Sequence, residues 1–275
     1  MLETLVDRET DRSVPDVEDF VPFEIVAGPA DRGLLIIADH ASNALPNEYG
    51  TLGTTREELS RHIGYDIGSA ALTRALAARL GAPAVLSTFS RLLIDPNRGA
   101  DDPTLVMRLS DGVVLPGNAK VDEAEKQRRV ERFYAPYHGA VDAAIDAGIA
   151  AGKPPAVFSV HSFTPVWRGW PRPWHAGVLW DQDPRFALPL IEKLREDPRL
   201  VVGDNEPYTG ALKNDSLYRH GTVRGIAHAL IEVRQDLISD DEGVEQWADR
   251  LAPIIEEILA LPGMNDIHVY GSAAG

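Results

Sequence analysis

The sequence has no cysteine among its 275 residues. That absence excludes disulfide bonds, thiolate nucleophiles, iron–sulfur clusters and cysteine-ligated zinc. A metal site in this chain must therefore use His, Asp, Glu, Asn or water as ligands. The absence is also compatible with the cytoplasm, where we expect the protein to act.

Long apolar runs are equally scarce. The longest clean run is Leu34–Ala38, whereas a membrane-spanning helix needs about 18 apolar residues. The segment 1–20 is acidic and is broken by Pro15, so it lacks the basic start and the apolar stretch of a signal peptide. We therefore expect no targeting segment and no membrane partner.

The chain is also poor in positive charge. It has 27 Lys and Arg against 42 Asp and Glu, which gives a formal net charge of −15. Nucleic acids and anionic membranes both bind basic surfaces, so neither is an expected partner. With 44% hydrophobic and 25% charged residues, the composition is that of an ordinary globular protein.

The spacing of apolar residues predicts alternating strands and helices. After an acidic lead-in over residues 1–22, we expect a single α/β domain over residues 23–275. Its architecture is a three-layer sandwich with a mostly parallel mixed sheet. Strands are expected at 34–38, 84–88, 91–94, 156–160, 177–180, 201–202 and 227–233, helices at 57–80, 123–150, 185–196 and 242–261, and a long loop at 99–120.

Several common catalytic motifs are absent. No G-x-G-x-x-G follows a strand and no G-x-x-x-x-G-K-[ST] occurs, which disfavours dinucleotide and nucleotide binding. No G-x-S-x-G surrounds a serine, and no H-E-x-x-H is present. Hydrolases with a nucleophile elbow and zincin-type peptidases are therefore disfavoured as well.

Four polar clusters come at the ends of predicted strands, where ligands bind in open α/β sheets. Two His and a carboxylate are able to share a metal ion, and a further Glu is able to act as general base on water. Arg and Asn nearby match a substrate carboxylate. The clusters are Asp39–Asn43, Asp95–Arg98, His161-Ser162 and Glu232–Arg234.

These residues also have purely structural interpretations. A single His after a strand is more often a packing residue than a ligand, and Asp-Pro-Asn is common turn chemistry. The aromatic segment Trp167–Trp174 fits a packed surface loop as well as a substrate contact. The residues alone therefore indicate a metal hydrolase without naming its substrate.

Seven segments with recognisable motifs follow one another along the chain: His40–Pro46, Ser90–Arg98, Pro116–Asn118, Pro136–His138, Ser159–Pro165, Gly203–Tyr208 and Ile231–Leu237. Together, over residues 23–260, they resemble the N-formylglutamate amidohydrolase family. The resemblance implies a fold similar to that of the zinc carboxypeptidases and aspartoacylases.

The resemblance implies a zinc site at a His-x-x-Glu pair and a later His. His40 matches the first position and His161 the later His, but Asn43 stands where the Glu is expected. Asp66 is the candidate replacement, as a helix carboxylate facing the sheet edge, and the Asn43 oxygen is the alternative. The expected cofactor is Zn²⁺ or another divalent transition metal.

The same resemblance implies roles for other residues. Glu232, in Ile231–Val233, matches the general base, and Arg91 resembles the arginine that polarises the scissile carbonyl. Asn97 and Arg98 match a motif that binds the substrate's α-carboxylate. Arg234 and His228 are weaker candidates for binding the side-chain carboxylate or for a supporting role.

The expected activity is hydrolysis of the amide bond of an N-acyl amino acid such as N-formyl-L-glutamate, in histidine degradation, with release of formate and glutamate. The expected partner is thus a small anionic substrate. Two alternatives remain: a hydrolase of the same mechanism acting on another N-acyl amino acid or peptide, and a non-catalytic small-molecule-binding protein. The sequence leaves the oligomeric state undetermined.

Overall fold

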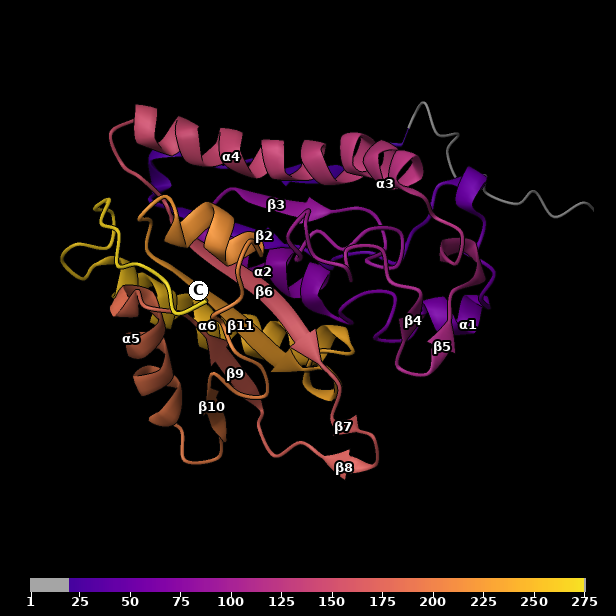
Figure 1. Cartoon of the computed structure of the whole chain (residues 1–275). Helices are drawn as coiled ribbons and strands as arrows, with labels where there is room; N and C mark the ends of the chain where they lie inside the picture. The colour runs from indigo at the N-terminus through magenta and orange to yellow at the C-terminus, as the bar shows by residue number, and fades with distance from the viewer. Residues whose placement is uncertain (1–19, 275) are drawn as a thin grey trace, which may run out of the picture.

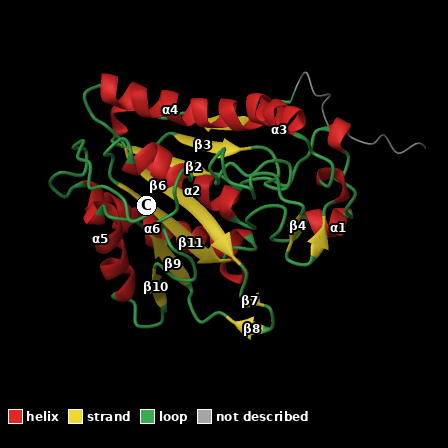
Figure 2. Ribbon diagram, in the orientation of Figure 1, coloured by secondary structure: helices red, strands yellow, loops and turns green. Residues whose placement is uncertain are grey.

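A computed structural model describes residues 20–274 as a sheet covered by helices (Figures 1 and 2). The strands are β1 (Phe23–Val26), β2 (Leu34–Ala38), β3 (Ala84–Ser87), β4 (Leu109–Ser110), β5 (Val113–Val114), β6 (Ala156–Phe163), β7 (Val166–Trp167), β8 (Trp170–Pro171), β9 (Ala176–Leu179), β10 (Val202–Asp204) and β11 (His228–Arg234). The helices are α1 (Arg56–Leu59), α2 (Ser69–Leu80), α3 (Glu123–Arg129), α4 (Ala135–Ala150), α5 (Pro184–Arg195) and α6 (Asp241–Leu259). Most of the predicted lead-in lies outside the described residues.

Seven strands form the main sheet in the order β1-β3-β2-β6-β11-β9-β10. Strands β3, β2, β6 and β11 are parallel to one another. The edge strand β1 is antiparallel to β3, and β9, which pairs in parallel with β10, is antiparallel to β11. The predicted mostly parallel mixed sheet is confirmed. The parallel strands end at one edge, toward the β4–β5 and β7–β8 hairpins (Figure 1).

Both faces of the sheet are covered, which explains why central strands such as β2 are apolar along their whole length. Helices α2, α5 and α6 pack on one face, around residues such as Ile36 and Phe158. Helix α4 and the turn that joins it to α3 pack on the other, around Leu35 and Val157. The sheet is therefore the middle of three layers.

The α4 face becomes polar toward the carboxyl ends of the parallel strands. Asp39 follows β2, Ser159 and His161 lie near the end of β6, and Glu232 lies near the end of β11. Glu232 and His161 are register partners on neighbouring parallel strands, so their side chains project from the same face. Both lie inside their strands rather than beyond them, because β6 continues to Phe163 and β11 to Arg234.

The strand predicted at residues 91–94 is wrong. This apolar segment is buried, but its backbone is paired with side chains instead of a neighbouring strand. Asn118 donates to the Leu92 carbonyl and Arg129 to the Leu93 carbonyl, both at 2.8 Å. Such local pairing satisfies buried carbonyls without a sheet. The spacing of apolar residues alone does not distinguish a buried strand from a buried segment that is paired by side chains.

The helix predicted at 57–80 is interrupted. It is divided into α1 and α2 by a turn segment that contains Gly64 and Gly68, the latter with a φ of 83°. A left-handed conformation is accessible to glycine and does not occur within a right-handed helix, so α2 begins only after Gly68. Asp66 therefore lies in a turn rather than on a helix, and its backbone N–H donates to the His40 carbonyl at 2.9 Å. The predicted helix end at Gly81 is confirmed.

Other differences are smaller. The edge strand β1 was not expected, and the predicted loop at 99–120 contains the short β4–β5 hairpin. The predicted helix at 123–150 is confirmed as a continuous helix, in which a π-helical turn over Val130–Tyr134 joins α3 to α4. Within residues 20–274, no helix combines the length and apolar character needed to cross a membrane.

Candidate metal centre and substrate cavity

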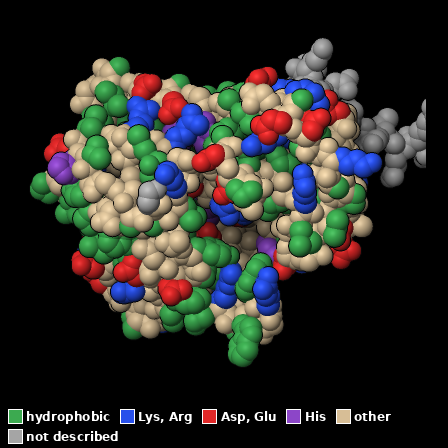
Figure 3. Space-filling model, in the orientation of Figure 1, with side chains coloured by type: hydrophobic (Ala, Val, Ile, Leu, Met, Phe, Trp, Pro, Cys, Tyr) green, Lys and Arg blue, Asp and Glu red, His purple; other side chains and the backbone are tan. Residues whose placement is uncertain are grey.

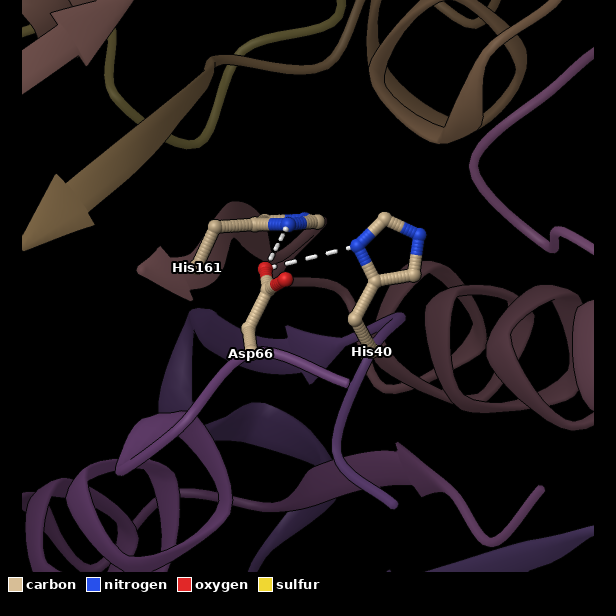
Figure 4. A group of neighbouring side chains, drawn as sticks. All are labelled: His40, Asp66 and His161. Atoms are coloured by element: carbon tan, nitrogen blue, oxygen red, sulfur yellow. Dashed lines mark hydrogen bonds and ion pairs between the residues drawn. The ribbon is translucent and has the colours of Figure 1, made fainter. Parts of the chain in front are cut away.

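Three buried side chains from separate segments meet at the polar edge of the sheet. His40 follows β2, Asp66 precedes α2 and His161 belongs to β6. One candidate ligand atom from each lies within 4.8 Å of the others. The Asp66 Oδ2 atom is 2.9 Å from His161 Nδ1 and 3.3 Å from His40 Nδ1, so the rings and the carboxylate point toward one another (Figure 4).

Each imidazole has a second carboxylate on its other nitrogen. His40 Nε2 is 2.7 Å from Asp95 Oδ1, and His161 Nε2 is 3.1 Å from Asp39 Oδ2. A carboxylate on the far nitrogen orients a ligating imidazole and raises its basicity. Both Nδ1 atoms are thus directed at Asp66, and this set of two nitrogens and one carboxylate oxygen fits a zinc ion.

The Asp39 carboxylate is itself held on several sides. Its Oδ1 accepts hydrogen bonds from Tyr137 at 2.9 Å and Ser216 at 2.6 Å. Burial alone raises the pKa of Asp39, but the hydrogen bond and charge of His161 outweigh burial and lower it. For Asp66, burial also acts to raise the pKa, and the charges and hydrogen bonds of His40 and His161 lower it overall. Both carboxylates therefore stay ionised.

The structure brings Asp66, rather than Asn43, between the two imidazoles. The Asn43 amide instead donates to the Leu59 carbonyl at 3.2 Å. The two alternatives for the third ligand, Asp66 and Asn43, thus lie in different places in the fold. Within residues 20–274, His40, Asp66 and His161 form a group whose ligand atoms are close enough to hold a metal ion.

Glu232 lies beside this group, and its carboxylate differs from those of Asp39 and Asp66 in its hydrogen bonding and its pKa. It is 7% exposed, and its Oε2 atom has no hydrogen-bond partner among the described residues. Burial raises the pKa of Glu232 to about 7, although the charge of His161 acts in the opposite direction. A buried carboxylate with a pKa near neutrality is suited to accept and return a proton.

Arg91 is tied to the carboxylates of the candidate metal centre. Its guanidinium donates to Asp95 Oδ2 at 2.9 Å and lies 3.5 Å from Asp66 Oδ1. Arg98 differs, because it has no carboxylate partner within the described residues and donates to the Asn97 carbonyl at 2.8 Å. The Asn97 Oδ1 atom accepts from the Ser216 N–H, which leaves the amide donors of Asn97 available.

A cavity of about 470 Å³ opens above these residues. Its floor contains the metal group, Glu232, Arg91, Asn97 and Arg98. Figure 3 shows the opening as a hollow in the molecular face, with Lys and Arg side chains around it. Apolar side chains form much of the wall, among them Phe163, Trp167, Leu179, Tyr208, Leu217 and Leu230. The volume is in the range of small-molecule sites.

Asp215 is a cavity residue that the sequence did not single out. It is 4% exposed, and burial raises its pKa to about 7. Asp39 and Asp95 belong to the polar clusters noted above, but their role as imidazole partners was missed. No sequence signal gave these pairs, because Asp39 contacts His161 and Asp95 contacts His40, each across a long sequence separation.

Two other predicted residues lie apart from this group. Arg234 is paired with Asp236 at 2.7 Å and is not among the residues that line the cavity. His228 lies at the opposite end of β11, where its Nδ1 is 2.7 Å from the Ile226 carbonyl oxygen. Of the aromatic segment, Trp167 lines the cavity whereas Trp170 is 80% exposed.

Comparisons with known proteins show what this chain is similar to. The sequence model of a family described as N-formylglutamate amidohydrolase matches residues 32–239. A crystal structure of a gene product from Agrobacterium tumefaciens is 32% identical, with a TM-score of 0.81 over 87% of this chain and 95% of that one. The structure of N-formylglutamate amidohydrolase from Ralstonia eutropha is 23% identical, with a TM-score of 0.68 over 87% and 98%, and supports the fold. A search among curated proteins found no match.

Proposed function

The chain belongs to the N-formylglutamate amidohydrolase family, and from this premise we propose that it hydrolyses the amide bond of an N-acyl amino acid with the help of a metal ion. The reference substrate is N-formyl-L-glutamate, which yields formate and glutamate. One observation carries the proposal. A buried pair of imidazoles converges on Asp66 beside a buried Glu232 that lacks a full set of hydrogen-bond partners.

His40, Asp66 and His161 would hold the ion. Zinc is the proposed metal, and iron, cobalt or manganese are accepted by similar His and carboxylate ligands. A bound zinc ion supplies Lewis-acid polarisation of a carbonyl and lowers the pKa of water. Asp39 and Asp95 keep the two imidazoles in the tautomer and orientation that ligation needs.

Glu232 is the proposed general base. Its free Oε2 atom is available to accept a proton from the attacking water. In the second half of the reaction, the same carboxyl group returns the proton to the nitrogen of the leaving amino acid. Its pKa of about 7 allows both transfers near neutral pH.

Arg91, Asn97 and Arg98 would position the substrate. Arg91 is held against Asp95 and is 20% exposed at the cavity, where its charge stabilises negative charge that develops on the scissile carbonyl. The amide donors of Asn97 and the guanidinium of Arg98 remain available for the α-carboxylate, for which a guanidinium fork is well matched.

The test joins metal content to activity. Purified protein should contain about one zinc ion per chain by elemental analysis, as a single three-ligand site implies, and release formate from N-formyl-L-glutamate. Chelation should abolish activity, and added zinc should restore it. Asp66→Asn should reduce both bound metal and turnover, whereas Asp146→Asn on the surface of α4 should retain both. Full activity of metal-free protein would contradict the proposal.

The apolar wall of the cavity favours one alternative, a substrate with a longer acyl chain. The same activity assay tests it. A formylated amino acid is small for a cavity of about 470 Å³, and a longer acyl chain would bury more of the wall formed by Leu179, Leu217 and Leu230. A panel of N-acyl glutamates with increasing acyl length should therefore be compared with the formyl compound. Metal-free protein that binds these compounds without turnover would support a binding protein instead.

A further inference from the structure

The turn that carries Asn97 and Arg98 is held from the side of α4. The Pro96 carbonyl oxygen is 3.0 Å from His138 Nε2, and the Tyr134 hydroxyl donates to the Arg98 carbonyl at 2.9 Å. The rings of His138 and Tyr134 pack together, with their centres 4.3 Å apart. Two side chains of one helical layer therefore fix the carbonyl groups on both sides of Asn97.

His138 belongs to a pair of buried imidazoles. Its Nδ1 atom is 2.8 Å from His220 Nε2, and His220 Nδ1 is 3.0 Å from Asp142 Oδ1. Both rings are shielded from solvent. Each ring nitrogen of the pair thus faces one polar atom of the protein.

The partners at the two ends of the pair fix the number of protons that it needs. A carbonyl oxygen only accepts hydrogen bonds, so His138 Nε2 must carry a proton toward Pro96. Burial alone raises the pKa of Asp142, but the hydrogen bond and charge of His220 outweigh burial and lower it to about 2. The ionised carboxylate also only accepts, so His220 Nδ1 must carry a second proton. The contact between the two rings requires a third.

Three protons are one more than two neutral imidazoles hold, so the pair carries one positive charge. Burial lowers the pKa of His138 to about 3, which makes His138 the neutral ring and His220 the imidazolium. Asp142 contacts this imidazolium directly and compensates its charge. The titratable groups that face the pair are Asp39, Tyr134, Tyr137, Asp142, Arg219 and Arg224.

We propose that the extra proton of the His138–His220 pair positions the turn of Asn97 and Arg98, so that substrate binding depends on whether the pair holds it. The two histidines are positioning residues, because they act through the turn and are not among the residues that line the cavity. The inference rests on the proposed function, in which Asn97 and Arg98 bind the α-carboxylate of the substrate.

Loss of the extra proton leaves two N–H groups for three contacts. The Asp142 carboxylate retains one N–H because it is the charged acceptor, and the contact between the rings uses the other. His138 Nε2 is then bare and faces the Pro96 carbonyl oxygen, so the turn loses its hydrogen bond to α4. The Ser216 hydroxyl does not replace this bond, since it donates to Asp39 at 2.6 Å and is 3.4 Å from the Pro96 oxygen.

The two end partners distinguish this arrangement from an ordinary structural pair of imidazoles. If one end of the pair met a hydrogen-bond donor, two neutral rings would satisfy every contact. Here both ends meet acceptors, the Pro96 carbonyl and the Asp142 carboxylate. A neutral pair would therefore leave one buried contact unsatisfied, which is costly away from water.

The first test counts the protons by nuclear magnetic resonance. In zinc-loaded protein with ¹⁵N-labelled histidine, the chemical shifts of the ring nitrogens distinguish protonated from bare nitrogens. Signals that disappear in His138→Gln or in His220→Gln identify the pair. At neutral pH we expect three protonated nitrogens and one bare nitrogen that accepts a hydrogen bond. Two bare nitrogens in the pair would overturn the proposal.

The second test uses Asp142→Asn, which replaces the acceptor at one end by an amide that is able to donate to His220 Nδ1. In the wild type, KM for N-formyl-L-glutamate should rise roughly three- to tenfold at alkaline pH, the effect of one lost hydrogen bond, with kcat nearly unchanged. In Asp142→Asn two neutral rings satisfy all contacts. The alkaline rise in KM should therefore disappear, and the pair should hold two protons at neutral pH.

Asp146→Asn is the matched control. Asp146 lies one turn further along α4 and pairs with Arg224, as Asp142 does, but it contacts neither imidazole. This variant should keep the wild-type dependence of KM on pH. A purely structural role predicts that Asp142→Asn raises KM or lowers stability at every pH, so an alkaline rise in Asp142→Asn equal to that of the wild type would contradict the proposal.

The backbone N–H signals of Asn97 and Arg98 report the position of the turn without any substrate. In the wild type they should shift with the same pH midpoint as the ring nitrogens of the pair, and in Asp142→Asn they should not shift. Turn signals that do not follow the ring nitrogens would overturn the inference. If the wild-type protein leaves N-formyl-L-glutamate intact, the proposed function fails, and these signals still decide whether the pair positions the turn.

Discussion

The carboxylate of Glu232 illustrates how one residue acquires a chemical role from its surroundings. Its neighbours on the same sheet face are the imidazole of His161 and, beyond it, the charges of Asp66 and Arg91. Burial raises its pKa to about 7, whereas the ion-paired and hydrogen-bonded Asp39 and Asp66 stay ionised. The proposed roles follow this difference: the ionised carboxylates would hold the metal or the imidazoles, and Glu232 would carry the proton.

Replacing Glu232 by Gln should separate catalysis from folding. The amide has nearly the same shape but accepts no proton at neutral pH, so kcat should fall by about 10²–10⁴. Metal content, KM and thermal stability should remain close to the wild-type values. Glu206→Gln, in the segment beside β10, is the control and should retain activity. Unchanged turnover of Glu232→Gln would remove Glu232 from the mechanism.

At the scale of elements, β9 brings a loop close to the site because it contains a glycine. Gly177 is the register partner of Glu232, and a Cβ atom added to Gly177 would lie 1.9 Å from the Glu206 carbonyl oxygen. The segment that leads to Tyr208 therefore packs directly on the strand. A side chain at this position would displace the segment that contacts Arg172.

Gly177→Ala should accordingly destabilise the protein by about 1–3 kcal/mol, the usual cost of forcing an extra group into a packed interior. It should also raise KM, because Tyr208 moves with the displaced segment. The matched control is Gly139→Ala within α4, where an added Cβ meets no atom within 4 Å. That variant should be stabilised by about 0.5–1 kcal/mol, since alanine is a better helix former.

Urea denaturation of the two alanine variants measures both effects. The free energies of unfolding should change in opposite directions relative to the wild type. Equal stability of Gly177→Ala and the wild type would show that the segment before Tyr208 does not pack on β9 as described.

At the scale of the whole molecule, a buried chain of imidazoles connects distant regions. His138 of α4 is 2.8 Å from His220 through Nδ1 and 3.0 Å from the Pro96 carbonyl oxygen through Nε2. His220 in turn is 3.0 Å from Asp142. This chain links α4, the segment before β11 and the segment that contains Pro96, so it contributes to the stability of the fold as a unit.

The protonation of His138 predicts how the stability of the protein depends on pH. Burial lowers the pKa of His138 to about 3, from an ordinary value of 6.5. Between these values the unfolded chain binds a proton that the folded protein does not, so stability is lost as pH falls from 6.5 toward 3. The loss reaches about 1.4 kcal/mol per pH unit for this group.

Denaturation at a series of pH values tests this expectation. His138→Gln should lack this part of the acid sensitivity, and its stability should change less steeply below pH 6.5. His268→Gln, at an exposed position near the C-terminus, should keep the wild-type dependence. If His138→Gln and the wild type have the same slope, the buried imidazole does not contribute to the acid limb.

The net charge of the whole molecule also bears on how an anionic substrate would bind. A net charge of −15 disfavours polyanionic partners, yet the proposed substrate is a small anion. The structure places Arg91 and Arg98 in the floor of the cavity and Arg172 behind its aromatic wall. Because Arg91 is already paired with Asp66 and Asp95, an anionic substrate would depend on direct contacts such as one with Arg98, since short-range contacts outweigh a screened overall field.

Local patterns of the sequence determined most strands of the main sheet and several candidate site residues. Buried runs such as Leu34–Ala38 predict β2 because burial on both faces requires continuous apolar residues. His40, His161 and Glu232 were found because they lie near the carboxyl ends of parallel strands, where side chains converge. The lack of cysteine in turn restricted the candidate ligands to imidazoles and carboxylates.

Only the tertiary structure decided the contacts between distant segments. Asp66 reaches its place between His40 and His161 through a turn at Gly64 and Gly68, where periodicity predicted a continuous helix. The apolar run at 91–94 is paired by side chains from the segments that contain Asn118 and Arg129, which no local pattern reveals. A repeating pattern encodes which face of an element is buried, whereas the partner of each polar group depends on how separate elements pack together.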